Sequence, residues 1–266
     1  MNLQSLLSQP KAKSPLITIA GEAGTGKTSL GAEFHNPVFL RIEDGSAALE
    51  GKDVALSPVI ENIEQVHKFI HLLQTEDHNF KTLVIDSISQ LDEIFKAHIM
   101  GLEKPGSKGR ENFALCCGGF GNAYTMLAKY HEDFYHLLSD LSAAKGMTIV
   151  FISHVVAIKV SPPDQNEYTR YALSVTRTGN IDCAKVYVNN CDLIGFLKQI
   201  SYVNEHGKIS TDATRILDCT HNLQYPSKNR YGIDRALPYK LGENPLANSI
   251  PYFQNQSNTN EQSEVI

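Results

Sequence analysis

The chain has 266 residues, of which 42% are hydrophobic and 20% are charged. These values are ordinary for one large globular domain with a substantial core, and the formal net charge of −5 excludes a surface that is basic throughout. The sequence has no apolar run of about 18 residues, the length that a membrane span requires, and its five cysteines include no C-x-x-C pair, so we expect a cytoplasmic protein with reduced thiols and without a zinc site.

The first predicted elements place a glycine-rich loop between a strand and a helix. A polar lead-in, residues 1–13, precedes a domain that we predict over residues 14–253. The apolar run Pro15–Ala20 indicates a buried strand, and Gly21–Thr28, with the sequence GEAGTGKT, follows it and leads into a helical pattern. This is G-x-x-x-x-G-K-[ST] in the strand–loop–helix context of a P-loop.

This loop has the chemistry to hold a nucleoside triphosphate. Its glycines allow backbone angles that turn successive N–H groups inward, toward a phosphate chain. Lys27 would reach the β- and γ-phosphates, and the Thr28 hydroxyl would ligate Mg²⁺ beside them. A glycine-rich turn that matches by chance is the alternative, and the strand–helix context argues against it. We therefore predict ATP and Mg²⁺ as ligands. The predicted nucleotide-binding residues are Gly21, Glu22, Ala23, Gly24, Thr25, Gly26, Lys27, Thr28 and Ser29.

A second predicted strand ends in a pair of acids. Pro37–Ile42 is largely apolar and is followed by Glu43 and Asp44. In an open parallel sheet, ligands collect at the carboxyl ends of the strands. One of these two carboxylates, with Glu43 favoured, would polarise the attacking water as a general base. The alternative is a solvated turn, which acidic residues commonly form.

The next strand supplies a predicted magnesium-side carboxylate. Ile60–Leu73 has apolar residues at helical spacing and indicates a crossover helix. The run Lys81–Ser87, KTLVIDS, then indicates a buried strand that delivers Asp86 to its carboxyl end. In this place after a P-loop, such an acid is expected to hold Mg²⁺ together with Thr28, through water, or to order the catalytic water.

A long loop follows the next helical pattern, Ser87–Met100. The segment Gly101–Gly121 is rich in glycine and carries Lys104, Lys108 and Arg110. Loops of this length are usually functional or disordered. One hypothesis is a flexible arm whose cations meet a polyanion, and the other is a loop that is simply solvated.

Another buried strand ends in a serine and a histidine. Asn122–Ala144 indicates a long amphipathic helix, and Met147–Ser153 indicates the strand, which leads directly into His154. This strand tip is expected to face the same crevice as Asp86. His154 is therefore a candidate sensor that hydrogen-bonds the γ-phosphate and reports hydrolysis. The alternative is a histidine that merely ends a strand.

The last third of the chain changes from a helical period to a period of two. Val155–Val160 and Tyr168–Thr176 indicate one hairpin, and Asp192–Ser210 indicates a second. Arg215–Asp218 adds a further strand. We expect these strands to extend the sheet at one edge. Residues 254–266 have the polar composition of a disordered tail.

Taken together, these motifs resemble those of the RecA-like ATPases. The shared features are the P-loop, a glutamate at the end of the second strand, the VIDS strand, a strand ending in Ser-His, and antiparallel hairpins after it. Within that group the chain is most similar to the phage AAA-type nucleotide-binding proteins, which include single-strand annealing and recombination ATPases of the Sak type. The resemblance covers Ser14–Tyr239. It implies an α/β fold: a RecA-like P-loop NTPase core with a central, mostly parallel sheet between helices, extended by C-terminal antiparallel hairpins.

The same resemblance gives a role to Tyr225–Asp234, which has the sequence YPSKNRYGID. A Lys-x-Arg followed by glycine is similar to the piece that, in RecA-like and DnaB-type hexameric motors, reaches into the neighbouring subunit's site. It implies that Lys228 and Arg230 contact the γ-phosphate in trans and offset the charge on the transferring phosphoryl group. The alternative is a basic surface turn.

The resemblance implies an ATPase that works as a homo-oligomer, either a ring or a filament, in the host cytoplasm if the chain is phage-encoded. Its implied partner is single-stranded DNA, which it would anneal or recombine and which would stimulate hydrolysis. A single-stranded-DNA-binding protein is a further candidate partner. The alternative is a nucleotide-dependent oligomeric switch, such as a helicase loader or regulator, without direct DNA chemistry. The predicted catalytic residues are Lys27, Glu43, Asp86, His154, Lys228 and Arg230.

Overall fold

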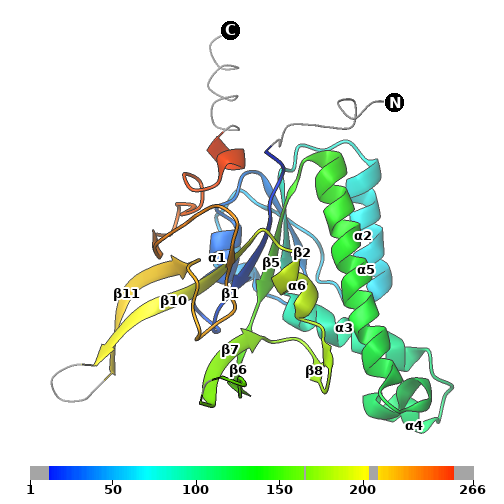
Figure 1. Cartoon of the computed structure of the whole chain (residues 1–266). Coiled ribbons are helices and arrows are strands. Elements are labelled where there is room, and N and C mark those ends of the chain that lie inside the picture. Colours follow the sequence, from blue (N-terminus) through cyan, green and yellow to red (C-terminus); the bar gives the residue numbers. More distant parts are fainter. Residues whose placement is uncertain (1–11, 165, 204–208, 255–266) are drawn as a thin grey trace, which may run out of the picture.

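The computed structural model describes residues 12–164, 166–203 and 209–254 (Figure 1). Its central layer is a nine-stranded sheet in the order β13–β11–β10–β1–β5–β4–β2–β3, with β12 paired to β10. Every pairing from β10 to β3 is parallel, whereas the pairings of β11 and β12 with β10 and of β13 with β11 are antiparallel. The strands of this sheet are β1 Leu16–Ala20, β2 Pro37–Arg41, β3 Ala55–Leu56, β4 Thr82–Asp86, β5 Thr148–Ser153, β10 Leu193–Val203, β11 Ile209–Asp218, β12 Lys228–Asn229 and β13 Leu237–Tyr239. The predicted α/β fold is confirmed.

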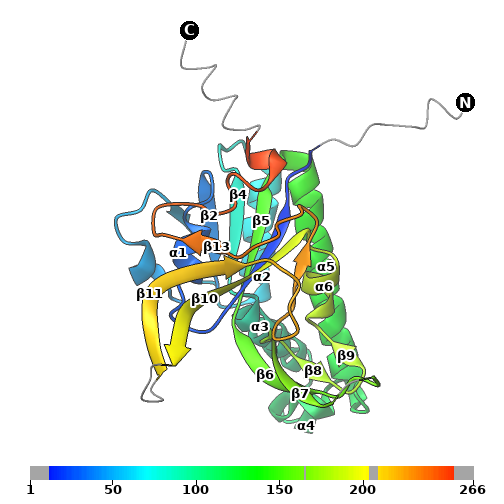
Figure 2. The ribbon, with the colours of Figure 1, turned by 60° about the vertical axis from the view of Figure 1, so that its left-hand side comes forward.

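Helices cover both faces of this sheet, with α2, α3 and α5 on one face and α1 on the other (Figures 1 and 2). The helices are α1 Lys27–Gly31, α2 Ile63–Thr75, α3 Ile88–Gly101, α4 Lys108–Glu111, α5 Asn122–Lys145 and α6 Lys185–Asn189, with 3₁₀ turns η2 Ser46–Leu49 and η3 Phe113–Gly118. Leu83 and Ile85 of β4 pack into the core on the α2 side, and Val84 packs into the core on the α1 side. Because both faces of these strands are covered, β1, β4 and β5 are buried along their whole length, and most of their residues are apolar.

The register of the parallel strands brings four chain segments to one edge. Asp86, the last residue of β4, lies opposite Arg41 of β2 and Ile152 of β5. Ala20, after which the P-loop begins, lies opposite Ser153. The residues that follow these four strand ends therefore meet, although long stretches of sequence separate them.

One hairpin does not join the central sheet. β6 Val155–Val160 and β7 Tyr168–Leu173 form a separate two-stranded sheet, which Figure 1 shows below the carboxyl end of β5. The expectation that this hairpin extends the sheet is wrong, because β1 and β4 already occupy both edges of β5. β10, β11 and β13 do extend the sheet, on the free side of β1. A further small hairpin joins β8 Arg177–Thr178 to β9 Ile181–Asp182.

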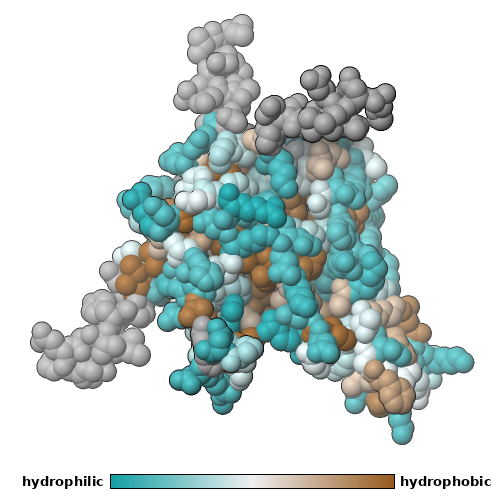
Figure 3. Space-filling view, viewed as in Figure 1, coloured by the Kyte–Doolittle hydropathy of each residue, from teal (hydrophilic) through white to brown (hydrophobic). Residues whose placement is uncertain are grey.

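The glycine-rich segment after α3 carries local helical structure. It contains α4 and η3, and it projects from one end of α5 (Figure 1). Figure 3 shows brown, hydrophobic atoms at this projection, and the exposed apolar side chains in this segment are Leu102, Leu115 and Phe120. The Phe120 ring is fully exposed at 103%, on a backbone with φ of 54° between Gly119 and Gly121.

The predicted ends of the domain lie largely beyond the part of the chain that the structure describes. Residues 1–11 of the predicted lead-in and residues 255–266 of the predicted tail are outside it. Among the described helices, none has the length and apolar character that crossing a lipid bilayer requires.

Candidate nucleotide-binding site

The P-loop has the backbone shape that its glycines predict. Gly24 and Gly26 have φ values of 77° and 100°, which side-chained residues rarely adopt. The Lys27 ammonium turns back into the loop, where its Nζ donates to the backbone oxygens of Gly21 at 3.0 Å and Glu22 at 2.8 Å. Burial lowers the pKa of Lys27, although Asp86 and Glu43 attract its charge. The loop thus holds one cation among inward-facing backbone groups.

Thr28 and Asp86 meet beside this loop. Thr28 Oγ1 donates to Asp86 Oδ2 at 2.8 Å. Burial raises the pKa of Asp86 to about 6, and the hydrogen bond from Thr28 only partly opposes this effect. A Cβ atom built on Gly45 would lie 3.7 Å from Thr28 Oγ1 and 3.8 Å from Asp86 Oδ2, so the glycine keeps the space beside both oxygens open. Hydroxyl and carboxylate oxygens suit a hard cation, and these two residues would hold Mg²⁺.

Glu43 and His154 form a pair at the same edge. His154 Nε2 lies 3.1 Å from Glu43 Oε1 and 3.4 Å from Oε2, and the two side chains are 36% and 35% exposed. The hydrogen bond with His154 is the main reason that the pKa of Glu43 is lowered, while burial opposes it. The backbone N–H groups of Ile42 and Glu43 donate to the Asp86 carbonyl at 2.7 and 3.2 Å, which fixes this turn against the end of β4.

Asp44 is the less suitable of the two neighbouring acids. Its side chain is 72% exposed and lies 3.8 Å from the Arg41 guanidinium. Glu43 instead interacts electrostatically with Lys27 and Asp86. The geometry therefore favours Glu43 as the carboxylate of this site.

Hydroxyl groups that the sequence analysis passed over support the pair. Ser87 hydrogen-bonds the Glu43 side chain. Ser89 Oγ accepts from the His154 backbone N–H at 3.0 Å. The signal in the sequence was the spacing S-x-S directly after the VID strand, which places both serines beside the strand tip.

The P-loop also touches the separate β6–β7 hairpin. Tyr171 of β7 donates from its hydroxyl to Glu22 Oε1 at 3.0 Å. The predicted loop residue Glu22 thus faces the hairpin, while its backbone oxygen holds Lys27.

The structure does not bring Lys228 and Arg230 to the P-loop of their own chain. Lys228 lies opposite Ile194 near the start of β10, and its Nζ donates to the Asn189 carbonyl. Arg230 Nη1 pairs with Asp192 Oδ1 at 2.7 Å. Asp192 is buried, and its other oxygen accepts from the backbone N–H of Leu16, at the opposite end of β1 from the P-loop.

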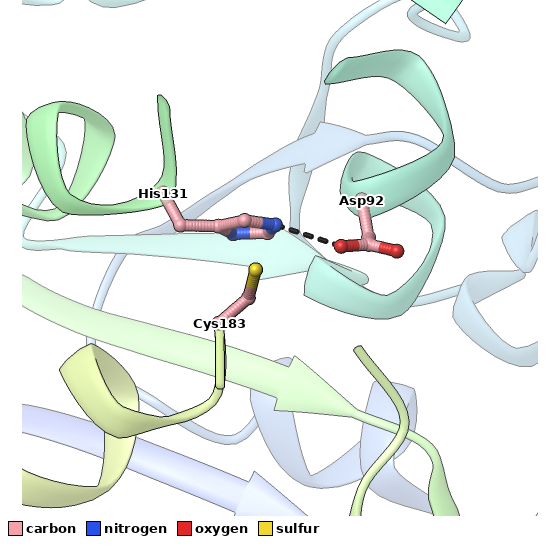
Figure 4. Close-up of side chains that lie close together, drawn as sticks. All are labelled: Asp92, His131 and Cys183. Carbon is pink, nitrogen blue, oxygen red and sulfur yellow. Dashed lines mark hydrogen bonds and ion pairs between the residues drawn. The ribbon is translucent and has the colours of Figure 1, made fainter. Parts of the chain in front are cut away.

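A second cluster of titratable groups lies inside the molecule. Asp92, His131 and Cys183 point toward one another, with ligand atoms all within 4.8 Å (Figure 4). Hydrogen bonds already occupy both ring nitrogens of His131, which bridges Asp92 at 2.9 Å and the Tyr187 hydroxyl at 2.8 Å. Asp92 also accepts from Lys96 and from Thr176, each at 2.7 Å. Burial raises the pKa of Cys183 to about 12, which keeps its thiol protonated. We assign this cluster to packing between helices.

A comparison with protein-family models agrees with the P-loop interpretation. A family model described as an AAA domain matches residues 13–231. No curated protein matches the chain. Among solved structures, the crystal structure of the RadB recombinase is similar at 15% sequence identity and a TM-score of 0.43, over 90% of this chain and 94% of that chain.

Proposed function

This chain belongs to the family whose model is described as an AAA domain, and from that premise we propose that it binds ATP with Mg²⁺ and hydrolyses the nucleotide. One observation carries the proposal: the Lys27 ammonium, the Thr28–Asp86 pair and the Glu43 carboxylate converge at the carboxyl ends of neighbouring parallel strands. These are the groups that phosphoryl transfer to water requires.

In the proposed reaction, the loop amides of Gly21–Thr28 and Lys27 bind the phosphate chain. When bound beside Thr28 and Asp86, Mg²⁺ would neutralise charge on the β- and γ-phosphate oxygens. Glu43 accepts a proton from water while the water oxygen bonds to the γ-phosphorus, and the bond from that phosphorus to the β–γ bridging oxygen breaks, which releases ADP and phosphate. His154 holds the Glu43 carboxylate in place and is the candidate sensor of the γ-phosphate.

We further propose a RecA-like role in which the chain forms a ring or filament and acts on single-stranded DNA in phage recombination or annealing. In such an oligomer, Lys228 and Arg230 would leave their partners in the same chain and contact the γ-phosphate of the neighbour. That exchange breaks the ion pair of Arg230 with the buried Asp192. Arg230 would therefore act in trans only where the nucleotide of the neighbouring subunit compensates for the lost ion pair.

The segment after α3 supports the DNA part of the proposal. It presents Lys104, Lys108 and Arg110, all exposed, together with the fully exposed Phe120 ring. Cations that follow a phosphate backbone and an aromatic ring on which a base can stack are the combination that binds single strands without sequence preference.

A nucleotide-dependent switch that docks on a protein, such as a helicase loader or regulator, is the second candidate function. The net charge of −5 and the exposure of Leu102 and Leu115 in the same segment as Phe120 favour a protein partner. The two functions differ in their response to salt, since DNA phosphate contacts weaken steeply as ionic strength rises.

The deciding experiment measures ATP turnover with and without single-stranded DNA over a series of protein concentrations. We expect turnover that rises cooperatively with protein and with DNA, and DNA binding that weakens between two ionic strengths. Lys27→Ala should lose nucleotide binding, and Glu43→Gln should bind ATP but not hydrolyse it. ATP turnover that does not respond to DNA, together with DNA binding that does not weaken as ionic strength rises, would favour the switch. Full nucleotide affinity in Lys27→Ala would contradict both functions.

A further inference from the structure

Arg215 lies against the P-loop although it is distant from it in sequence. It belongs to β11 and is paired in register with Gln199 of β10 and Tyr239 of β13. A Cβ atom built on Gly26 would lie 3.5 Å from Arg215 Nε and 3.7 Å from both its Cδ and its Cζ. The Nε end of the Arg215 side chain therefore lies beside the glycine that precedes the P-loop lysine, and Figure 2 shows β11 and β13 passing beside α1.

The Arg215 guanidinium has an unused donor. Its Nε is buried and has no hydrogen-bond partner among the described residues. The hydroxyl of Tyr239, the cross-strand neighbour of Arg215, is likewise buried and unpaired within that part of the chain. Cross-strand neighbours lie on the same face of a sheet. Two orphan polar groups thus occur side by side, next to a loop built to bind an anion, and a buried donor without an acceptor is costly unless a ligand supplies one.

The strand that carries Arg215 is fixed relative to the P-loop. The carbonyl of Leu197 in β10 packs so closely on Gly21 that no side chain would fit there. β11 pairs with β10 through this region, with Leu217 opposite Leu197. The backbone on which Arg215 is mounted therefore cannot move far from the loop without disrupting the sheet.

We propose that Arg215 is a ligand of the α- and β-phosphates of the bound nucleotide, supplied by the same chain. This inference rests on the proposed nucleotide binding. Backbone N–H groups of a P-loop cradle these two phosphates, and Arg215 lies over that part of the loop at Gly26. A guanidinium matches phosphate oxygens in charge and in geometry. Arg215 would thus bind ATP and ADP alike, unlike Arg230, whose proposed contact is with the γ-phosphate of a neighbour.

A phosphate ligand and a purely structural residue differ in what their removal does to stability. Because its Nε bonds no described residue, removing the guanidinium should cost the ligand-free protein little stability. The expected signature is a variant that melts at the same temperature as the unmodified chain without nucleotide, but gains less melting temperature when nucleotide is added.

The test is calorimetric titration of the full chain with ATP, ADP, inorganic tripolyphosphate and adenosine. Arg215→Ala should weaken the binding of the first three by roughly 10- to 100-fold, with no change for adenosine, since one charge-assisted contact is lost. Arg215→Lys should recover part of the affinity. The exposed Arg235→Ala serves as the matched control and should bind as the unmodified chain does.

The outcomes separate this inference from the function on which it rests. If the unmodified chain binds no nucleotide, the proposed function fails. If it binds ATP and Arg215→Ala binds equally well, Arg215 is not a ligand. If Arg215→Ala loses affinity for ATP but not for tripolyphosphate, the phosphate contact is overturned and the guanidinium contacts the base or the sugar instead. If Arg215→Ala does not fold, Arg215→Gln, which keeps the length of the side chain, is titrated in its place.

Discussion

His154 Nε2 lies 3.1 Å from Glu43 Oε1, although the two residues are 111 positions apart in the chain. They meet because β2, β4 and β5 are adjacent and parallel, so their carboxyl ends share one edge. The pair also interacts with Asp86 and Lys27 electrostatically. A carboxylate whose charge is stabilised by a histidine, next to a cation for phosphate, is the arrangement on which hydrolysis would depend.

Replacing His154 should move the pH dependence of ATP turnover. The hydrogen bond from His154 lowers the pKa of Glu43, so the carboxylate stays ionised to lower pH. In His154→Ala this pKa rises, and the acidic limb of the pH–rate profile should shift to higher pH. The exposed His67→Ala is the control and should keep the original profile. An unchanged acidic limb in His154→Ala would show that Glu43 is not the base.

Magnesium binding should compete with protons at Asp86. Burial raises the pKa of this carboxyl to about 6, so a growing fraction is protonated, and unable to hold a cation, as pH falls below that value. We expect the magnesium-dependent part of ATP affinity to fall about tenfold per pH unit well below pH 6. Adding EDTA at pH 7.5 should produce the same loss. Asp86→Asn should remove the magnesium dependence at every pH, and a persistent dependence in that variant would exclude Asp86 as a ligand.

The buried Asp92 should stabilise the fold, and acid should remove this contribution. Burial alone would raise the pKa of Asp92, but hydrogen bonds from His131, Lys96 and Thr176 outweigh it and lower the pKa to about 2. Because the folded-state value lies below the unfolded one, the stabilisation is complete above about pH 4 and is lost as pH falls toward 2. Asp92→Asn should lower the free energy of unfolding at pH 7 by about 2 kcal/mol.

Denaturant unfolding at several pH values measures this effect. The difference in the free energy of unfolding between Asp92→Asn and the unmodified chain should become smaller toward pH 2. Asp140→Asn, at an exposed position, should not differ from the unmodified chain at any pH. A difference in the free energy of unfolding that stays constant with pH would show that Asp92→Asn acts through packing and not through loss of the ionised carboxylate.

Arg230 calls for a mixing experiment because its substitution has two effects. Arg230→Ala should abolish ATP turnover, yet it also leaves the buried Asp192 without its 2.7 Å partner. Lys27→Ala subunits are inactive for a different reason and keep Arg230. If the arginine acts on a neighbour, mixing the two inactive variants should restore turnover, since some sites then combine an intact P-loop with an intact arginine. A mixture that stays inactive, while each variant still folds and oligomerises, would contradict the proposal that Arg230 acts on the nucleotide of a neighbouring subunit.

The individual helices and strands can be predicted from the sequence, whereas the pairing and order of several strands cannot. The apolar runs of β1, β4 and β5 and the helical spacing of α2 and α5 predict these elements within a few residues. The convergence of Lys27, Glu43 and Asp86 follows from parallel pairing alone. The detachment of β6–β7 depends on which strands flank β5, and strand order is not encoded locally.

Arg215 was missed for a related reason. A single arginine in a strand with no motif around it carries no signal, and its position over Gly26 becomes visible only when β11 is placed beside β10 and the P-loop. The ion pair of Arg230 with Asp192 is equally long-range, since it joins a predicted turn to the residue before β10.

The hydroxyl of Tyr171 bonds the carboxylate of Glu22, whose backbone oxygen accepts from the lysine. The β6–β7 hairpin is thereby in mechanical contact with the phosphate cradle. Thermodynamic linkage makes such a coupling symmetric. If a molecule that binds the hairpin changes the affinity for ATP by some factor, then bound ATP changes the affinity for that molecule by the same factor. A titration of either ligand in the presence of the other would thus report the coupling in both directions.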